Sequence, residues 1–368
     1  MALRDIIGQE QALKILRGSI AKNRIAHAYL FTGEDGIGKK LTAINFAKVL
    51  NCQKTETEKI RSWEDKNIST SQPLNFATSQ MIDSELRTLN SELIAQIDCC
   101  EECPSCKKIN KSIHPDVFFI APAGGQIKVD VIRKLEESLS YKVFEGRWKI
   151  AIIDGAETLN QFAANAFLKT LEEPPGESLL ILISSMPEII PGTIQSRCQR
   201  VNFLPLPFEK MIELLEQRPK LRIQNTDNPP SPPFTPHLLS MLSGGRLGWA
   251  LSEDLIERRG RVFDEFKDLL SGVEEDLWEG SDSMQEWFEW VHLWLRDIAV
   301  FKATNRVDLL INQDKGKDIK DISKKAELKD ILRLSSTLSS IKGLLRFNLN
   351  KQVILYHTHL LLKTTFSL

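Results

Sequence analysis

The sequence predicts an α/β fold for its first 205 residues: a parallel sheet with helices on both faces. Short apolar runs alternate with helical patterns in this part, and a glycine-rich loop joins the first run to a helix. From Ser252 onward the pattern is helical. Because 368 residues exceed one usual domain, we predict three: 1–205, a small helical unit at 206–251, and an all-α domain at 252–368.

The expected sheet has five short strands, most of them apolar runs. They are Ala28–Phe31, Val117–Ala121, Trp148–Ile153, Leu179–Ile183 and Gln199–Phe203. After the third strand, Thr158 with Gln161 fits a capping box, and the segment Pro174-Pro175-Gly176 ends the helix that follows. His27, just before the first strand, is expected to be a buried core histidine.

Charge and composition limit the classes of partner. Lysine and arginine number 48 and aspartate and glutamate 49, so a net charge of -1 excludes a generally basic surface for nucleic acid. No apolar run approaches the roughly 18 residues of a membrane span, and the N-terminus lacks the apolar core of a signal peptide. We expect a soluble cytoplasmic protein without a membrane partner. Any contact with DNA would have to be local or shared with partner subunits.

Two segments interrupt the regular pattern. Residues 53–98 form a polar insertion with helical spacing in its second half and an expected mobile first half. Further along, the proline-rich stretch NPPSPPFTP is typical of an extended loop. In the C-terminal region, Trp287, Trp290 and Trp294 share one helical face, which favours packing between helices over a stacking platform for bases.

The segment GEDGIGKK fits the phosphate-binding pattern G-x-x-x-x-G-K-[ST] except at its last position. Gly33, Gly36 and Gly38 would let backbone N–H groups turn toward phosphates, and Lys39 would neutralise the outer phosphate oxygens. The strand before this loop and the helix after it are the context that such a loop requires. These residues therefore predict a nucleotide site.

The set of groups that would bind magnesium and activate the attacking water is incomplete. Lys40 stands where a hydroxyl normally holds magnesium, and Thr42 lies about 200 degrees further round the helix. Asp154 ends the third strand, where an acid would meet the metal, but Gly155 replaces the glutamate that polarises water in hydrolysing proteins of this architecture; Glu157 would turn elsewhere. Efficient hydrolysis, weak or regulatory binding of ATP with magnesium, and an empty site all stay open, hydrolysis being least favoured.

A cluster of cysteines predicts a metal centre. Cys100, Cys103 and Cys106 give three thiolates at close spacing, and tetrahedral zinc needs a fourth. Cys52, at the end of the helix after the glycine-rich loop, is the predicted fourth ligand, and Cys99 is its rival. Structural zinc is favoured over an iron–sulfur centre and over free thiols.

Several segments match one family. They are Ile7–Gln9, Arg24–Phe31, the glycine-rich loop, the cysteine cluster, Asn165–Pro175 and Ser196–Cys198. Together they resemble the delta-prime subunits of the bacterial DNA polymerase III clamp loader, which are AAA+ relatives of the gamma/tau subunits. The resemblance covers residues 1–251 and continues loosely through Trp294–Asp297. It implies an AAA+ domain with a zinc module, a small helical lid, and a helical collar for oligomerisation.

The resemblance also implies a catalytic role for Arg197, with Ser196 beside it. In this family the arginine reaches across a subunit boundary to the ATP of a gamma/tau neighbour, whereas residue types alone favour a surface ion pair. Aligning Gly245–Leu251 with a sensor segment of the hydrolysing relatives puts Gly248 at the place of an arginine, with Arg246 nearby. Together with the two changes at the nucleotide site, this predicts a subunit that does not hydrolyse ATP.

The implied function is help in loading the sliding clamp on primed DNA, with gamma/tau and delta subunits as partners. The chain would be a component of a DNA-directed DNA polymerase holoenzyme, without polymerase activity of its own. Two rivals stay open. One is an autonomous AAA+ ATPase of gamma/tau or helicase-loader type, and the other is a zinc-dependent interaction protein with a vestigial phosphate loop.

Overall fold

The computed structural model describes residues 1–54, 94–123, 125–217, 236–252, 255–272, 278, 281–345 and 350–366. The chain forms two compact units: residues 1–206 with 246–248, and residues 207–245 with 249–368. The finer division into three domains stays a prediction. Most of the polar insertion and of the proline-rich stretch lies outside the described residues.

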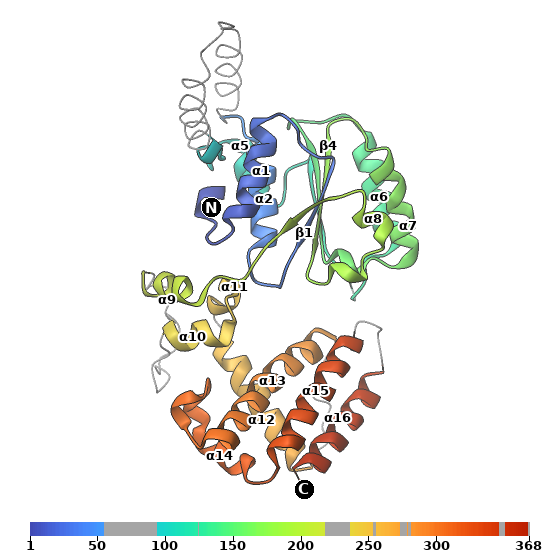
Figure 1. The fold of residues 1–368 in the computed structure, drawn as a ribbon. Coiled ribbons are helices and arrows are strands. Elements are labelled where there is room, and N and C mark those ends of the chain that lie inside the picture. The colour runs from blue at the N-terminus through green and yellow to red at the C-terminus, as the bar shows by residue number, and fades with distance from the viewer. Residues whose placement is uncertain are drawn as a thin grey trace, which may run out of the picture. The chain divides into compact units, whose positions relative to one another are not determined.

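The first unit is built on a five-stranded parallel sheet with the order β2-β3-β4-β1-β5 (Figure 1). The strands are β1 Ala28–Thr32, β2 Val117–Ile120, β3 Lys149–Asp154, β4 Ser178–Ser184 and β5 Gln199–Asn202. Each end lies within one residue of the prediction. The parallel α/β class is therefore confirmed.

The two faces of the sheet each carry an apolar core. On β1, Tyr29 and Phe31 belong to one buried cluster, whereas Ala28 and Leu30 belong to the other. Successive side chains of a strand point to opposite faces. A strand covered on both faces therefore appears in the sequence as an unbroken apolar run.

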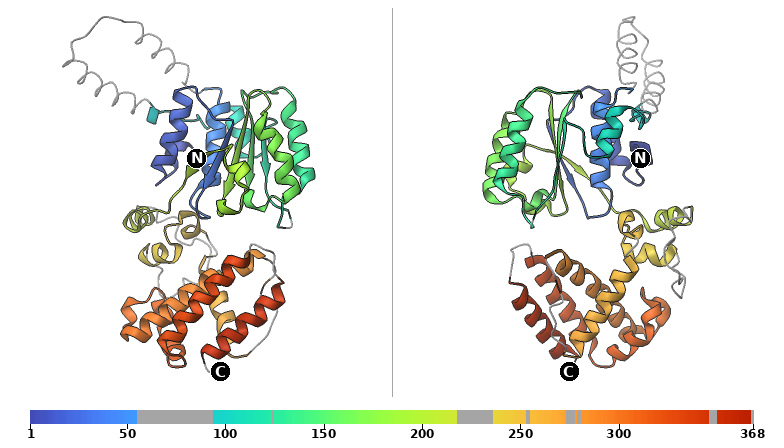
Figure 2. Two further views of the ribbon diagram at one scale, coloured as in Figure 1. Left: turned by 45° about the vertical axis from the view of Figure 1, so that its right-hand side comes forward. Right: turned by 180° about the vertical axis from the view of Figure 1, so that it is seen from behind.

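Helices cover both faces of this sheet (Figures 1 and 2). One layer consists of α1 Glu10–Ala21, α2 Lys39–Asn51 and α5 Pro104–Asn110. The other consists of α6 Val129–Ser140, α7 Gln161–Glu172 and the short α8 Gly192–Gln195. The arrangement leaves the loops at the two edges of the sheet to form sites.

Two local predictions are wrong. The N-cap of α7 is Asn160, whose side chain accepts a hydrogen bond from the N–H of Ala163 at 2.8 Å. Thr158 instead ends a short 3-10 turn and donates to the carbonyl of Gly155, so it forms no capping box with the helix. His27 is exposed, because it lies outside the strand whose side chains the helices cover.

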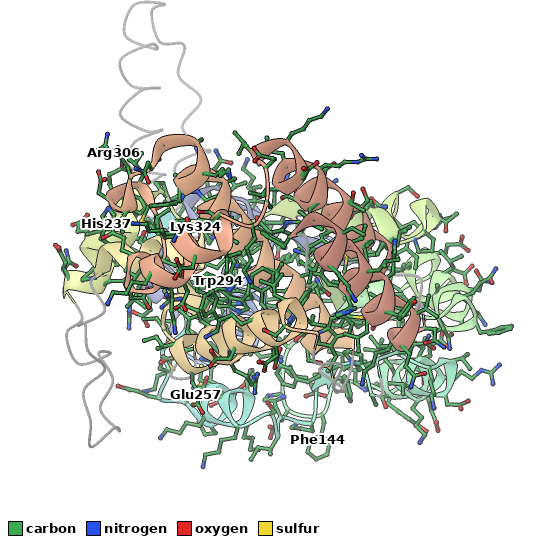
Figure 3. The ribbon with its side chains drawn as sticks, turned by 90° about the horizontal axis from the view of Figure 1, so that it is seen from below. Phe144, His237, Glu257, Trp294, Arg306 and Lys324 are labelled. Carbon is green, nitrogen blue, oxygen red and sulfur yellow. The ribbon has the colours of Figure 1, made fainter. Side chains whose placement is uncertain are left out.

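The described part of the second unit is helical. Its helices are α9 Phe208–Gln217, α10 Pro236–Ser243, α12 Leu255–Leu270, α13 Ser281–Thr304, α14 Gly316–Ser323, α15 Leu328–Leu344 and α16 Lys351–Thr365; α11 Leu247–Ala250 is divided between the units. The predicted packing role of the tryptophans on α13 is confirmed: Trp287, Trp290 and Trp294 are at most 1% exposed in an apolar cluster, and Figure 3 shows Trp294 among the helices. None of the helices described combines the length and apolarity that crossing a membrane requires.

Candidate functional site

The glycine-rich loop lies at the carboxyl edge of the sheet, between β1 and α2. Its residues Gly36 and Gly38 have φ values of 78° and 100°, which glycine adopts without the strain of a Cβ atom. Asp154, the last residue of β3, ends at the same edge of the parallel sheet. Open α/β sheets bind ligands in the crevice at this edge. The structure thus brings the loop and the predicted acid together.

Lys40 reaches Asp154 directly. The Lys40 Nζ lies 3.0 Å from Asp154 Oδ2, so an ammonium neutralises the carboxylate that would otherwise meet a divalent cation. Thr42 cannot replace the missing hydroxyl, because it is buried and donates to the carbonyl of Gly38 at 2.9 Å. The residues present therefore do not fit magnesium.

Lys39 is turned back onto its own loop. Its ammonium donates to the carbonyl of Gly33 and, at 2.7 Å, to that of Glu34, and it lies 3.2 Å from Asp35 Oδ1. The side chain is only 4% exposed. A phosphate group would have to displace these contacts before Lys39 could bind it.

The water-activating group is absent at Gly155. This residue has φ of 71°, a left-handed conformation that disfavours a glutamate. The next acid, Glu157, accepts hydrogen bonds from the backbone N–H and the hydroxyl of Ser185 at 3.1 and 2.8 Å. As expected, Glu157 is turned elsewhere.

Gly248 touches the glycine-rich loop through its backbone. Its N–H donates to the carbonyl of Gly36 at 2.8 Å, and a Cβ atom at position 248 would lie 2.8 Å from the same oxygen. A side chain at 248 would therefore require the loop to move. Arg246 lies with its Nε 3.8 Å from Glu34 Oε2, at the outer part of the loop.

The four predicted metal ligands come together. The Sγ atoms of Cys52, Cys100, Cys103 and Cys106 all lie within 4.8 Å of one another. Tetrahedral zinc with bonds of about 2.3 Å to sulfur places its ligands about 3.8 Å apart. The set therefore fits a metal such as zinc. It includes Cys52 at the end of α2, as predicted, and not its rival Cys99.

The thiols differ in their readiness to ionise. Burial opposes ionisation of Cys100, but backbone N–H groups of Cys103 and Glu102 and the Cys52 thiol lower its pKa to about 7. A hydrogen bond with Cys99, and then burial, raise the pKa of Cys106. Burial also raises that of Cys103. Because zinc binds thiolates, its binding would release protons from this cluster.

Arg197 lies at the opposite edge of the sheet from the glycine-rich loop. It precedes the first residue of β5, whereas the loop follows the last residue of β1, and the two strands pair in parallel. A strand of this length spans roughly 15 Å. Arg197 therefore cannot serve the glycine-rich loop of its own chain.

The guanidinium of Arg197 is held by two neighbours. One terminal nitrogen lies 2.6 Å from Glu172 Oε1, and the other donates to the carbonyl of Thr193 at 2.8 Å. Ser196 also donates to Thr193, at 3.2 Å. Glu172 has no local signal in the sequence, because it lies 25 residues from Arg197. Residue Cys198 is partly buried, and burial raises its pKa to about 12.

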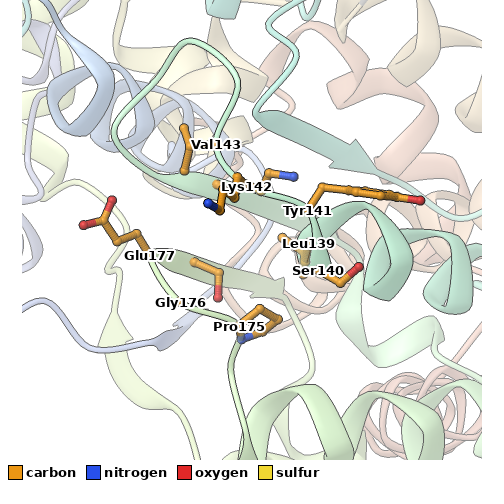
Figure 4. Close-up of a pocket in the computed structure, with 10 residues that line it drawn as sticks. Leu139, Ser140, Tyr141, Lys142, Val143, Pro175, Gly176 and Glu177 are labelled. Carbon is orange, nitrogen blue, oxygen red and sulfur yellow. The ribbon is translucent and has the colours of Figure 1, made fainter.

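A cavity of about 420 Å³ also lies at the amino edge of the sheet. It is lined by the end of α6, by the starts of β3 and β4, and by the adjoining Tyr141, Pro175 and Gly176 (Figure 4). The glycine-rich loop lies at the other edge. This cavity is therefore not the nucleotide site.

Residues 8–89 and 73–207 match the sequence model of the family described as "DNA polymerase III, delta subunit". The chain belongs to this family. Residues 274–364 match a second model of the delta family, described as "DNA polymerase III, delta subunit, C terminal". The resemblance predicted from the motifs is thereby confirmed, and with it a role in DNA replication.

Two delta' subunits are similar in sequence to this chain over almost its whole length. The DNA polymerase III subunit delta' of Bacillus subtilis (strain 168) is 27% identical and covers 96% of each chain. That of Pseudomonas aeruginosa is also 27% identical, over 95% of each. The subunit tau of Escherichia coli (strain K12) is 31% identical over 67% of this chain and 32% of its own length. This delta-family chain therefore matches delta' subunits over almost its whole length and tau over two thirds of its length.

One solved structure matches over nearly all of both chains. It is a DNA polymerase III gamma subunit-related protein from Thermotoga maritima, with 19% identity, coverage of 96% of this chain and 99% of that one, and a TM-score of 0.43. The α/β fold itself is shown by the parallel sheet and its two helical layers.

Proposed function

We propose that this chain, a delta-prime-type clamp-loader subunit, assists ATP-bound partners in placing the sliding clamp on primed DNA by donating Arg197 to a neighbour's nucleotide site. The partners are the gamma/tau and delta subunits of the same complex. Ser196 shapes the loop that presents the arginine. The cytoplasm is the proposed location.

The position of Arg197 carries this proposal. The residue lies in a loop at the edge of the sheet remote from its own phosphate loop, with a side chain 35% exposed. A guanidinium at such a place can contact a nucleotide only if another molecule brings it. Its planar fork suits phosphate oxygens and stabilises their charge during transfer.

The chain's own nucleotide site, which we propose does not hydrolyse ATP, supports the same assignment: this chain donates the arginine and its neighbour hydrolyses ATP. Lys40 neutralises Asp154, the left-handed Gly155 has no acid to offer, and Gly248 leaves no room for a sensor side chain. We infer that Gly33, Gly36, Gly38 and Lys39 keep a phosphate-binding loop in which ATP and magnesium bind weakly or not at all. The chemistry then belongs to the neighbour.

The remaining parts have structural roles in this proposal. Zinc held by the four cysteines would join α5 to the end of α2. The helical region 252–368 would form the collar. On α16, Val353, Tyr356 and Leu360 are 65%, 64% and 46% exposed and share one face by their spacing. Such an apolar stripe suits a surface covered by partner subunits.

The test is Arg197→Ala in the reconstituted complex, with ATP hydrolysis measured in the presence of clamp and primed DNA. An arginine acting in trans contributes about 10³–10⁵ in rate at the site it serves, so the contribution of that site should disappear. Arg200→Ala, an exposed arginine on β5, is the matched control and should retain activity. Unchanged hydrolysis in Arg197→Ala, or an equal loss in both variants, would overturn the proposal.

A further inference from the structure

We propose that Glu172 is a positioning residue for Arg197: a counter-ion within the chain that a neighbour's nucleotide phosphate must displace. The inference rests on the proposed function of Arg197 and adds a step to it. In the free chain, the arginine is already neutralised by a carboxylate. Binding to a neighbour's site is then an exchange of one anion for another.

The geometry of this pair is specific. Glu172 is the last residue of α7, and Thr193 belongs to α8, which packs beside α7. The guanidinium of Arg197 bonds to the carboxylate of the first at 2.6 Å and to the carbonyl of the second at 2.8 Å. These two contacts give the arginine one defined position at the amino edge of the sheet.

The negative charge at the end of α7 explains why a cation such as Arg197 stabilises the Glu172 carboxylate. The C-terminal end of a helix carries partial negative charge, which disfavours an acid in the last turn. Glu172 lies there with Glu173 directly after it. Arg197 compensates for both the helix end and the carboxylate. When the guanidinium leaves, the end of α7 is left with uncompensated negative charge.

The pair is nevertheless weak enough to open. The side chains of Arg197 and Glu172 are 35% and 51% exposed, and an exposed ion pair changes an equilibrium constant by a factor of at most about five. A nucleotide phosphate carries more charge and meets the arginine in a site from which partner subunits exclude water. Bonds between guanidinium and phosphate are stronger there. The exchange is therefore favoured only in the assembled complex.

The charge of Glu172 is tested by Glu172→Gln, whose amide keeps the size and can still accept a hydrogen bond. In the reconstituted complex, the KM for ATP should fall about two- to fivefold, with kcat changed less than about twofold, because the competitor is lost and the catalytic group is kept. Glu173→Gln, the exposed neighbour, should leave both constants unchanged. The double variant Glu172→Gln/Arg197→Ala should behave as Arg197→Ala alone.

These outcomes separate the two ideas. If Arg197→Ala leaves hydrolysis unchanged, the proposed function itself is lost. If Arg197→Ala lowers hydrolysis but Glu172→Gln matches Glu173→Gln, only the counter-ion role is lost. It is also lost if Glu172→Gln changes KM equally with and without Arg197.

A measurement on the full-length free chain gives independent evidence. Phenylglyoxal modifies guanidine groups and reacts more slowly with one held in an ion pair. Mass spectrometry should show Arg197 modified about two- to fivefold faster in Glu172→Gln, with Arg200 as the internal reference. Equal rates in the variant and the original chain would overturn the inference without any assay of the complex.

Discussion

The pair between Lys40 and Asp154 leads to a quantitative prediction about magnesium. The substitution Lys40→Thr supplies the hydroxyl that the phosphate-loop pattern specifies and frees the carboxylate of Asp154, now 3.0 Å from the ammonium. An ammonium about 4 Å from a divalent cation repels it by about 2 kcal/mol even at the dielectric constant of water. That energy corresponds to a factor of about thirty in affinity. The exposed pair itself contributes less than about 1 kcal/mol to folding, so the variant should remain folded.

We expect Lys40→Thr to bind ATP at least about tenfold more tightly with magnesium than with EDTA, whereas the original chain should show little dependence on magnesium. The assay is titration of the full-length chain with a fluorescent ATP analogue. Lys40→Ala removes the charge without adding the hydroxyl and should show a smaller gain. Turnover should stay at background in all three proteins, because Gly155 and Gly248 are unchanged.

Two results would refute this reasoning. Affinity of Lys40→Thr that does not respond to magnesium would show that the ammonium is not what excludes the metal. Steady turnover by that variant would show that the missing groups at the other two positions do not prevent hydrolysis.

Three further predictions concern the metal centre and the framework around the sites. Cys52→Ser should lose most of its zinc in a metal assay, whereas Cys99→Ser should retain it. Gly248→Ala should lower the free energy of unfolding by about 1–3 kcal/mol, measured in urea, because its Cβ would contact loop backbone; Gly260→Ala, with nothing within 4 Å, should be neutral or stabilising by up to about 1 kcal/mol. Burial alone would raise the pKa of Asp116, but three backbone N–H donors lower it. The ionised Asp116 stabilises the fold above the ordinary aspartate pKa of 3.8, and this stabilisation is lost as pH falls through the lower folded pKa. Asp116→Asn should therefore lower the free energy of unfolding by about 2 kcal/mol at pH 7 and by less below pH 4.

Each of these has an outcome that would contradict it. Full zinc content in Cys52→Ser would remove that residue from the ligand set. Equal stability of the two glycine variants would show that the loop yields to a methyl group. A cost of Asp116→Asn that does not change with pH would mean that packing, rather than the charge, accounts for its effect.

Much of the fold could be predicted because its signals are local. The central strands β1, β3 and β4 are buried on both faces, so each is a largely apolar run whose ends are visible in the sequence. The cysteine spacing predicts three sulfurs close together, at and before the start of α5, and Cys52 is predicted from its place at the end of α2. The cap of α7 was misplaced because both Thr158 and Asn160 are good N-cap residues, and only the backbone conformation distinguishes them.

The contacts within the candidate sites could not be predicted from the sequence as well as the fold could. The sequence shows Lys40 as a charge in place of a hydroxyl, but its contact with Asp154 joins the start of α2 to the end of β3, which only the order of the sheet brings together. Glu172 has no feature that sets it apart from Glu173 beside it. Pairings between segments distant in sequence depend on the packing of the whole sheet and its helices, and no local pattern records them.

The contact between Gly248 and Gly36 limits which substitutions this chain can accept during evolution. It is a hydrogen bond between two backbones at 2.8 Å, so it survives changes to the side chains around it. An arginine could return to position 248 only together with a new path for the loop, and a glutamate at 155 would meet a backbone that disfavours it. Single substitutions therefore do not lead back to an active site. Under the proposed function, restoring hydrolysis would therefore require several coordinated changes, which favours keeping the role in trans.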